Sequence, residues 1–343
     1  MTDQSNQRIV LASRPDGRPK PSDFRIEHAP IPEPRDGEVL LETLYLSLDP
    51  YMRWRMSAAK SYADPVEIGE VMVGGTVARV ARSHHPDWRE GDIVLSGSGW
   101  QSHAISDGDG LRRLDPTVAP PSTALGVLGM TGFTAYAGLL TIGRPKPGET
   151  VVVAAASGAV GSVVGQIARI KGARAVGIAD GPEKCAYLRN ELGFDAAVDR
   201  GAPDFTQKLA EACPDGIDVY FESVGGPVWD AVLPLLNDFA RVPVCGLIAH
   251  YNDGPDTSEG SDRLPATMHA ILSKSLSVRG FIMTEFVEQQ QPDFLREASQ
   301  WIAEGKLRWR EDVVDGLERA PDAFIGLLEG KNFGKLIVRV GTV

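Results

Sequence analysis

The chain has 343 residues, which is long for a single hydrophobic core and predicts two domains. It carries 35 Lys and Arg against 46 Asp and Glu, and a surface with a formal net charge of −11 repels phosphate backbones, so nucleic acid is excluded as a partner. The 3 cysteines are widely spaced, which excludes a disulfide framework and favours a reducing compartment. The N-terminus lacks the hydrophobic segment of a signal peptide and the apolar runs are too short to span a bilayer, so we expect a cytoplasmic protein without a membrane partner.

The first third of the chain predicts a β-rich domain. Residues 38–46 alternate polar and apolar side chains, as a half-buried strand does. Residues 71–80 predict two short strands joined through Gly74-Gly75, and residues 91–95 predict a turn that enters a strand. Frequent Pro and Gly favour a small barrel over helices in this region.

The middle of the chain alternates strand-like and helix-like runs. Strands are predicted at 150–156, 174–179, 196–199, 217–224, 242–248 and 276–283, with helices at 160–171 and 183–192. This alternation predicts a parallel sheet covered by helices on both faces, which is a doubly wound α/β domain. After an amphipathic stretch at 294–302, the runs 306–311 and 335–340 predict strands that rejoin the first domain.

The turn at residues 155–161 (AASGAVG) gives the sharpest local signal, because it follows a predicted strand and opens a predicted helix. Gly158 permits an anion to approach the backbone, and Gly161 permits the helix to pack closely on the strand. The helix N-terminus then offers unpaired N–H groups to a pyrophosphate. The pattern is AxxGxxG rather than GxGxxG, so the alternative is a tight turn that binds nothing; the flanking elements favour dinucleotide binding.

The residues after the second and third strands of such a domain distinguish NAD from NADP. Asp180 lies near the position where an acid binds the ribose 2′-hydroxyl of NAD, whereas Lys184 and Arg200 could clamp the 2′-phosphate of NADP. Alternatively, Asp180 caps the helix that starts near Pro182 and Lys184 is merely solvated. These residues leave both NADPH and NADH open.

Several motifs occur in order along nearly the whole chain. They include LSLDPYMR (46–53), IGEVMVGGTV (68–77), LGMTGFTAY (128–136), KPGETVVV (146–153), ASGAVGSVVGQIA (156–168), VYFESVGG (219–226), RVPVCGLI (241–248) and FIGLLEGKNFGKLIVRV (324–340). In these motifs the chain resembles the medium-chain dehydrogenase/reductase superfamily. Within it, the chain is similar to the zinc-independent branch of prostaglandin reductases, plant double-bond reductases and curcumin-reductase-like enzymes.

The resemblance implies a GroES-like β-barrel domain formed by both chain ends, residues 1–127 and 313–343, and a Rossmann domain at 128–312. It also implies NADPH-dependent reduction of α,β-unsaturated ketones and aldehydes, and a homodimer joined through the edge of the Rossmann sheet near 278–283. The cofactor contacts then comprise Gly158, Ala159, Val160, Gly161, Ser162, Asp180, Lys184, Arg200, Ser223, Cys245, Gly246, Tyr251, Phe281, Ile282, Met283 and Asn332.

Four residues depart from the family pattern. Arg200 replaces a tyrosine at the 2′-phosphate position, which could keep or strengthen that contact. Asp180 replaces a glycine and leaves the preference for NADPH over NADH open. Ser223 replaces the Asn of FENVGG and alters one polar contact. Trp54 replaces a glycine of DPYMRGRM, and it either reshapes the substrate entrance or packs on the surface.

No metal site is expected, because the ligands of the zinc-dependent relatives are missing. Residues 47–49 (SLD) lack the Cys of the first catalytic loop, and residues 68–70 (IGE) lack the His of Gly-His-Glu. We expect the 6 histidines to be either exposed to solvent or packed against other side chains rather than bound to a metal ion.

A phenol is the catalytic group that we expect. Hydride delivery to the β-carbon of an enone leaves an enolate, which must be stabilised and then protonated. Tyr251 follows the fifth strand of the α/β domain, at the edge where ligands of such sheets bind, and the resemblance points to the same residue. Tyr51 is a second candidate hydroxyl. The polar segment 252–265 is interpreted either as a lid that excludes water or as an ordinary exposed loop.

Two other functions remain open on the sequence. One is a zinc-free quinone reductase on the same scaffold, and the other is a non-catalytic dinucleotide-binding sensor. The physiological substrate and the oligomeric state are not determined by the sequence.

Overall fold

The computed structural model describes residues 5–253 and 263–341. The chain divides into two compact units. The first comprises Met1–Gly126, Glu311–Asn332 and Leu336–Val343, and the second comprises Val127–Arg310 and Phe333–Lys335.

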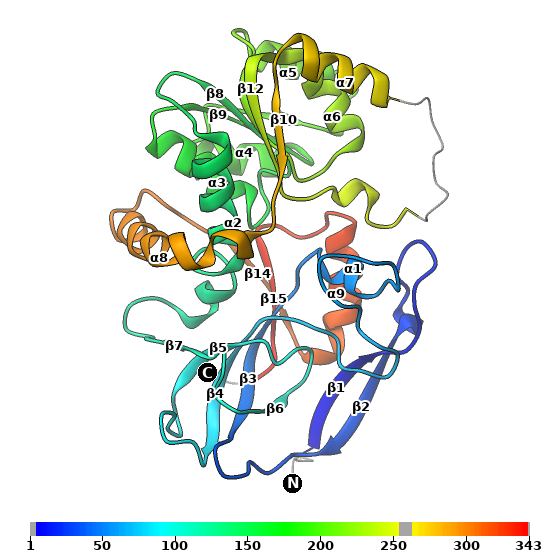
Figure 1. The fold of residues 1–343 in the computed structure, drawn as a ribbon, viewed down its shortest axis with the longest axis vertical. Helices are drawn as coiled ribbons and strands as arrows, with labels where there is room; N and C mark the ends of the chain where they lie inside the picture. Colours follow the sequence, from blue (N-terminus) through cyan, green and yellow to red (C-terminus); the bar gives the residue numbers. More distant parts are fainter. Residues whose placement is uncertain (1–4, 254–262, 342–343) are drawn as a thin grey trace. The chain divides into compact units, whose positions relative to one another are not determined.

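The first unit is built from β-sheets. Strands β1 (Ser5–Leu11) and β2 (Phe24–Pro30) pair antiparallel. A second sheet has the order β14-β15-β3-β4-β5-β7, with β6 paired to β3 (Figure 1). Its strands are β3 (Val39–Ser47), β4 (Thr76–Ser83), β5 (Ile93–Ser96), β6 (His103–Ser106), β7 (Arg112–Leu114), β14 (Glu311–Asp315) and β15 (Lys335–Arg339). The last two strands come from the end of the chain, so this end joins the sheet of the first unit.

An aromatic cluster forms part of the core of the first unit. The ring of Trp100 stacks on that of Phe24, with centroids 5.5 Å apart, and meets the edge of Phe324. Phe324 lies on α9 (Ala320–Leu328), so this helix closes over the sheet residues of the N-terminal segment. The short α1 (Met52–Arg55) contributes Met52 to the same cluster.

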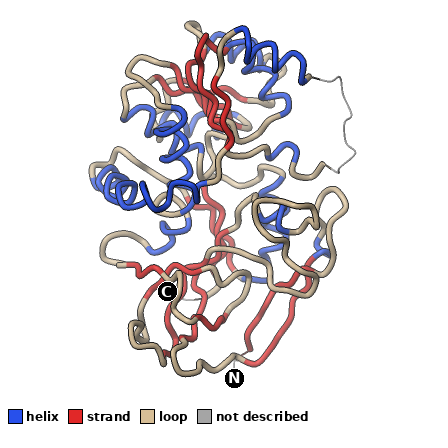
Figure 2. The backbone as a smooth tube through the Cα atoms, in the orientation of Figure 1, coloured by secondary structure: helices blue, strands red, loops and turns tan. Residues whose placement is uncertain are grey.

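The second unit is a parallel sheet with helices on both faces (Figure 2). Its strands are β8 (Thr150–Val153), β9 (Arg174–Ala179), β10 (Ala196–Asp199), β11 (Ile217–Phe221), β12 (Leu236–Val244) and β13 (Ser277–Gly280). They lie in the order β10-β9-β8-β11-β12-β13, and each neighbouring pair is parallel. This is the order of two mononucleotide-binding halves that meet between β8 and β11, so the expected doubly wound fold is confirmed.

The alternation of side chains along the strands produces two hydrophobic cores. In β8, Val151 and Val153 face one core while Val152 faces the other. The first core is covered by α2 (Met130–Ala137), α3 (Gly161–Ile170), α4 (Pro182–Asn190) and α8 (Val287–Ala303). The second is covered by α5 (Phe205–Ala212), α6 (Gly226–Val232) and α7 (Leu264–Ser273).

The sequence expectations differ from the structure most clearly at three strands. The two strands expected in 71–80 are wrong: β4 begins only at Thr76, because Gly74 packs against Leu46, Met52 and Trp100 instead of turning a hairpin. The strand expected at 306–311 is also wrong, since β14 begins at residue 311. The fifth strand of the α/β unit begins and ends earlier than expected. Its polar Asn237 and Arg241 obscure the apolar pattern, but they bond to Asp218 and Glu149.

Within the residues that the structure describes, no helix is both long and apolar enough to cross a membrane. The segment 252–265, interpreted as a lid or a loop, falls largely on residues 254–262, which lie outside the described residues.

Candidate functional site

The parallel sheet gathers most of the predicted contact residues at one edge. Parallel strands end at the same edge of a sheet, and there ligands of open α/β sheets bind. The residues in question are Gly158 to Ser162 after β8, Asp180 and Lys184 after β9, Arg200 after β10, Ser223 after β11, Cys245, Gly246 and Tyr251 after β12, and Phe281 to Met283 after β13. Every strand of this sheet therefore contributes to the candidate site. Tyr51 and Asn332 belong to the first unit.

The glycine turn between β8 and α3 is tightly folded. Gly158 N donates to Ala155 O at 2.9 Å, and Ala155 has a φ of 47°, a left-handed conformation that is costly for a residue with a Cβ. A Cβ on Gly161 would lie 2.5 Å from Ala155 O and 2.8 Å from Ala156 Cα, so only glycine fits where α3 begins. The close helix–strand approach expected at Gly161 is confirmed. A Cβ on Gly158 would meet only Ala155 O, at 3.1 Å.

The segment at 333–335 supports this turn. Gly334 N donates to Ser157 O at 3.2 Å, and Gly334 has a φ of 89° beside Arg310 O. The guanidinium of Arg310 lies 4.0 Å from the ring centroid of Phe333, which also meets Tyr187 edge-on. These contacts fix the end of the loop that begins at Asn332.

The loops after β9 and β10 are joined by an ion pair and by hydrogen bonds. Arg200 Nη2 lies 3.1 Å from Asp180 Oδ2. The carboxylate of Asp199 accepts hydrogen bonds from the amides of Gly181 and Gly201, each at 2.9 Å, and these two bonds lower the pKa of Asp199 below its usual value. The N-cap of α4 is Gly181 rather than Asp180, so the interpretation of Asp180 as a helix cap is wrong.

A buried carboxyl group organises the loop after β11. Glu222 accepts hydrogen bonds from Val224 N at 2.6 Å and Gly225 N at 2.9 Å. Burial raises the pKa of Glu222 above its ordinary value, and these amide bonds oppose the shift. Because Gly225 has a φ of 76°, the carboxyl group holds a turn that glycine makes possible.

The loops after β11 and β12 are tied to each other. Ile248 N donates to Ser223 O at 3.2 Å, and Ser223 Oγ lies 3.6 Å from Cys245 Sγ. Burial raises the pKa of Cys245 to about 11, so its thiol is protonated at neutral pH and is a poor nucleophile.

Tyr251 follows the short helix η5 (Ile248–His250) and is half-buried. A Cβ on Gly246 would lie 2.9 Å from Tyr251 Oη, so the hydroxyl rests against the loop directly after β12. The neighbouring His250 pairs with Asp253 at 2.7 Å.

The remaining predicted residues have different surroundings. The ring of Phe281 is buried against Phe221 and Phe286, so its side chain is part of the hydrophobic core. Ile282 and Met283, which follow it, are more exposed. In the first unit, Tyr51 follows β3 and is half-buried, and burial followed by the charge of Asp49 raises its pKa well above the usual value.

Trp54 keeps 36% of its surface exposed, which leaves its side chain partly accessible on α1. No group of three or more His, Cys, Asp and Glu side chains in the described ranges is arranged to hold a metal ion.

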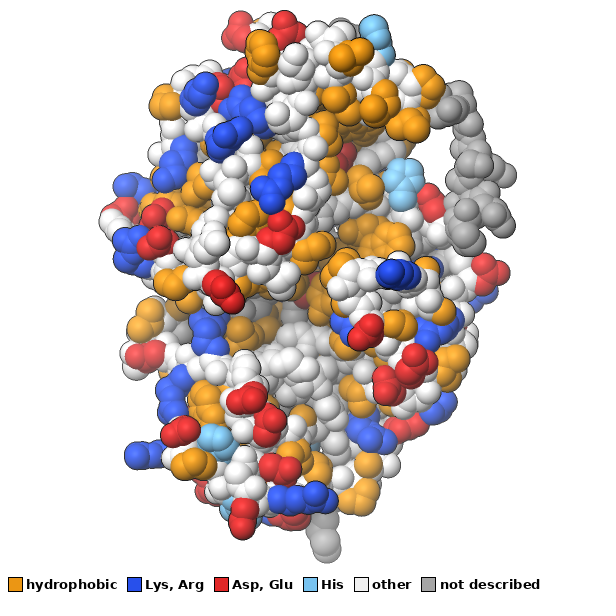
Figure 3. Space-filling view, viewed as in Figure 1, with side chains coloured by type: hydrophobic (Ala, Val, Ile, Leu, Met, Phe, Trp, Pro, Cys, Tyr) orange, Lys and Arg blue, Asp and Glu red, His pale blue; other side chains and the backbone are white. Residues whose placement is uncertain are grey.

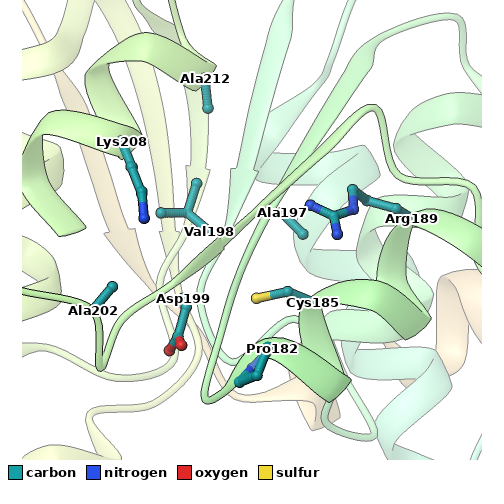
Figure 4. A pocket seen from close by; sticks show the side chains of 9 residues that line it. All are labelled: Pro182, Cys185, Arg189, Ala197, Val198, Asp199, Ala202, Lys208 and Ala212. Carbon is teal, nitrogen blue, oxygen red and sulfur yellow. The ribbon is translucent and has the colours of Figure 1, made fainter. Parts of the chain in front are cut away.

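A cavity of about 400 Å³ lies beside the 2′-phosphate candidates, between α4, β10 and α5 (Figure 4). Its lining comprises Pro182, Cys185, Arg189, Ala197, Val198, Asp199, Ala202, Lys208 and Ala212. Asp199 and Ala202 link the cavity to the end of β10 and to the loop that follows it.

Three residues of the site were missed by sequence reasoning. Asp199 is the last residue of β10, and its carboxylate accepts hydrogen bonds from the amides of Gly181 and Gly201. In the sequence we looked for cations that could bind the 2′-phosphate and therefore passed over this acid. Glu222 lies in the recognised FESVGG motif, but its carboxyl group appears in the sequence as one more polar loop residue. The left-handed backbone of Ala155 has no sequence signal, because alanine rarely adopts it.

Comparison with known proteins agrees with these observations. Residues 7–114 match a family model described as the N-terminal domain of oxidoreductase, and residues 159–304 match one described as zinc-binding dehydrogenase. The chain is 56% identical to the NADPH-dependent curcumin reductase of Escherichia coli (strain K12), covering 98% of this chain and 97% of the relative. It is 42% identical to prostaglandin reductase 1 of Bos taurus, covering 94% and 95%.

A solved structure is equally similar. CurA from Vibrio vulnificus, in complex with NADPH, has a TM-score of 0.95 and 54% identity to this chain, covering 98% of it and 100% of the solved chain. The expected fold class, a GroES-like domain beside a Rossmann domain, is confirmed. The chain is an oxidoreductase and belongs to the zinc-independent branch of the medium-chain dehydrogenase/reductase superfamily, together with the curcumin and prostaglandin reductases.

Proposed function

We propose that this protein binds NADPH along the carboxyl edge of the parallel sheet and reduces the carbon–carbon double bond of α,β-unsaturated ketones or aldehydes. The observation that carries the proposal is that the loop after each strand of this sheet contributes a candidate contact. The names of the relatives support it, since one is an NADPH-dependent curcumin reductase and another a prostaglandin reductase.

The candidate contacts follow the order of the strands across the sheet, from the 2′-phosphate end of the dinucleotide to its nicotinamide end. Arg200 and Lys184, after β10 and β9, would hold the 2′-phosphate. The close turn at Gly161 places the N-terminus of α3 beside the central strand β8, where the positive end of the helix dipole would face the pyrophosphate. Ser223, the 245–251 loop and residues 281–283 would hold the nicotinamide half, and Asn332 would complete the contacts. When bound, NADPH supplies the hydride.

Tyr251 is the group that we assign to the substrate oxygen. Addition of a hydride to the β-carbon places negative charge on the carbonyl oxygen, and a phenol hydroxyl that donates a hydrogen bond stabilises this oxyanion. A proton must then reach the α-carbon, so the overall reaction consumes one hydride and one proton. Tyr51 would contribute a second hydroxyl; its raised pKa makes it a hydrogen-bond donor rather than an acid.

The second unit would then serve as the dinucleotide-binding domain, and the first, with Tyr51 and Trp54, as the substrate domain. All three cysteines, which lie within the described residues, are free. Free thiols fit the reducing cytoplasm that we propose as the location.

We also propose a homodimer joined through β13. This strand forms an edge of the sheet and all of its residues are exposed. Hydrophobic side chains gather on the surface over α7 (Figure 3). On this helix, Leu272 is 79% exposed, and Leu264 and Met268 are more than half exposed. An open strand edge beside an apolar helix is a surface that a second copy would cover.

The test is the loss of reduced-nicotinamide absorbance with a simple aliphatic enone, run in parallel with NADPH and NADH. A benzoquinone is tested under the same conditions, and products are identified. The proposal expects consumption of NADPH and a saturated ketone. Reduction of the quinone without reduction of the enone would contradict it, and so would tight NADPH binding without turnover of any enone.

A further inference from the structure

Asp180 forms an ion pair with Arg200, one of the two cations that would hold the 2′-phosphate of NADPH. Asp180 Oδ2 lies 3.1 Å from Arg200 Nη2, although the two residues follow different strands. The side chains are 46% and 44% exposed, so the pair is solvated and weak enough for a ligand to separate.

The position of this pair is fixed by Asp199. Its carboxylate binds the amide of Gly181, next to Asp180, and the amide of Gly201, next to Arg200. A Cβ on Gly201 would lie 3.3 Å from Asp199 Oδ1 and 3.5 Å from Asp180 Oδ1. The carboxylates of Asp180 and Asp199 therefore both lie close to the loop that carries Arg200.

The two carboxylates should weaken the binding of NADPH, whereas the Asp180 carboxylate should strengthen the binding of NADH. A 2′-phosphate carries a charge close to −2 and would have to replace the Asp180 carboxylate on Arg200 while remaining near both acids. A 2′-hydroxyl carries no charge and can donate a hydrogen bond to an acid at this position. The same carboxylate that hinders NADPH can thus bind NADH.

We propose that Asp180 is a specificity-determining residue that competes with the 2′-phosphate for Arg200, which gives this enzyme a small preference for NADPH and substantial affinity for NADH. This inference rests on the proposed function, in so far as the second unit must bind a nicotinamide dinucleotide. Arg200 favours NADPH, Asp180 favours NADH, and Asp199 holds both loops in place.

The experiment measures binding to the full-length protein by titration calorimetry, without substrate. The ligands are NADPH, NADH and 2′,5′-ADP, which carries the 2′-phosphate without the nicotinamide. The variants are Asp180→Asn, which keeps the shape of the side chain, and Asp180→Gly, which removes it. Asp204→Asn is the matched control, because it removes the same charge from an ion pair with Lys208 in the same unit.

We expect both Asp180 variants to bind NADPH and 2′,5′-ADP about three- to tenfold more tightly, because the competing charge is gone. Asp180→Gly should bind NADH several-fold more weakly, because the acceptor for the 2′-hydroxyl is lost. The control should leave the ratio of NADPH to NADH affinity unchanged.

An unchanged ratio in both Asp180 variants would overturn the inference, and so would an equal shift in Asp204→Asn, which would reveal a general charge effect. Strong NADPH binding by all forms with an unaltered ratio would leave the proposed function intact while refuting the role of Asp180. Failure of the unmodified protein to bind any of the three ligands would refute both.

Discussion

The hydroxyl of Tyr251 rests against Gly246, so closely that a Cβ added to this glycine would lie 2.9 Å from the Tyr251 oxygen. Gly246 is the second residue after β12. Tyr251 follows η5, which is tied to the loop after β11 through Ile248 N and Ser223 O. The fold therefore holds the phenol at the carboxyl edge of the sheet, beside the loops to which we assign the nicotinamide.

Tyr251→Phe should lower kcat by roughly 10²- to 10³-fold, the usual effect of removing one donor to a developing oxyanion. The affinity for NADPH should stay within about twofold, because the ring remains. Steady-state kinetics with an enone and calorimetry with NADPH measure the two effects. Tyr45→Phe, which alters a phenol packed against a buried cluster that contains Val77 and Ile337 in the first unit, serves as the control. Unchanged turnover in Tyr251→Phe would remove Tyr251 from the mechanism.

Gly246→Ala should reproduce much of this loss without unfolding the protein. The added methyl group meets only the end of the Tyr251 side chain within 3 Å, and this side chain can move aside at little cost to stability. We expect a fall in kcat of about tenfold or more and a melting temperature close to that of the unmodified protein. Since both changes act on one hydroxyl, the double variant should be no slower than Tyr251→Phe alone. Additive losses would show that Gly246 acts by another route.

Gly161→Ala should weaken both folding and NADPH binding. Its Cβ would press on the backbone at Ala155 O and Ala156 Cα, which cannot move without opening the turn, so we expect a loss of about 1–3 kcal/mol in the free energy of unfolding. The dissociation constant of NADPH should rise at least about tenfold, since the opened turn would no longer hold the N-terminus of α3 in position for the pyrophosphate.

The control for this change is Gly165→Ala, one turn further along α3. Its Cβ would lie 1.9 Å from the ring of Phe194, so it should also destabilise the core but leave the NADPH affinity of the folded protein unchanged. Melting curves and NADPH titrations compare the two. Equal NADPH affinities would refute the role of the turn in binding the cofactor.

Glu222 should make the stability of the protein fall as pH rises. Because burial raises its folded pKa above the unfolded value of about 4.5, its contribution is fully present below that value and is lost as pH rises through the folded pKa. Glu222→Gln keeps an oxygen that accepts from Val224 N and Gly225 N but cannot ionise. Its stability relative to the unmodified protein should therefore increase between pH 4.5 and 8, by on the order of 1 kcal/mol.

Urea denaturation at several pH values measures this difference. The exposed Glu304 provides the contrast, because the hydrogen bond from Lys306 lowers its pKa, and Glu304→Gln should show no such gain. A stability difference for Glu222→Gln that decreases with pH would mean that the folded protein favours the carboxylate.

The sequence predicted the parts of the fold that depend on local pattern. The strands at Thr150–Val153, Arg174–Ala179 and Ala196–Asp199 are short apolar runs beside turn residues, and all three were recognised. The strand that contains Asn237 and Arg241 was mispositioned, because its polar residues are stabilised by partners that are distant in the sequence.

The same distinction holds for the site. The glycine turn and Tyr251 could be located from their motifs, but the pairing of Asp180 with Arg200 could not, since it depends on how the loops after two strands are brought together. Sequence reasoning weighed these two residues as independent signals for NADH and NADPH. The structure shows that they interact with each other, which is the basis for the proposed competition.

The most direct test of the central claim follows the hydride itself. NADPH deuterated at both C4 positions is incubated with an aliphatic enone, and the product is analysed by NMR and mass spectrometry. The account predicts a saturated ketone with one deuterium at the former β-carbon and a solvent-derived proton at the α-carbon. An allylic alcohol with deuterium on the former carbonyl carbon would contradict it, because the hydride would then have been added to the carbon–oxygen double bond.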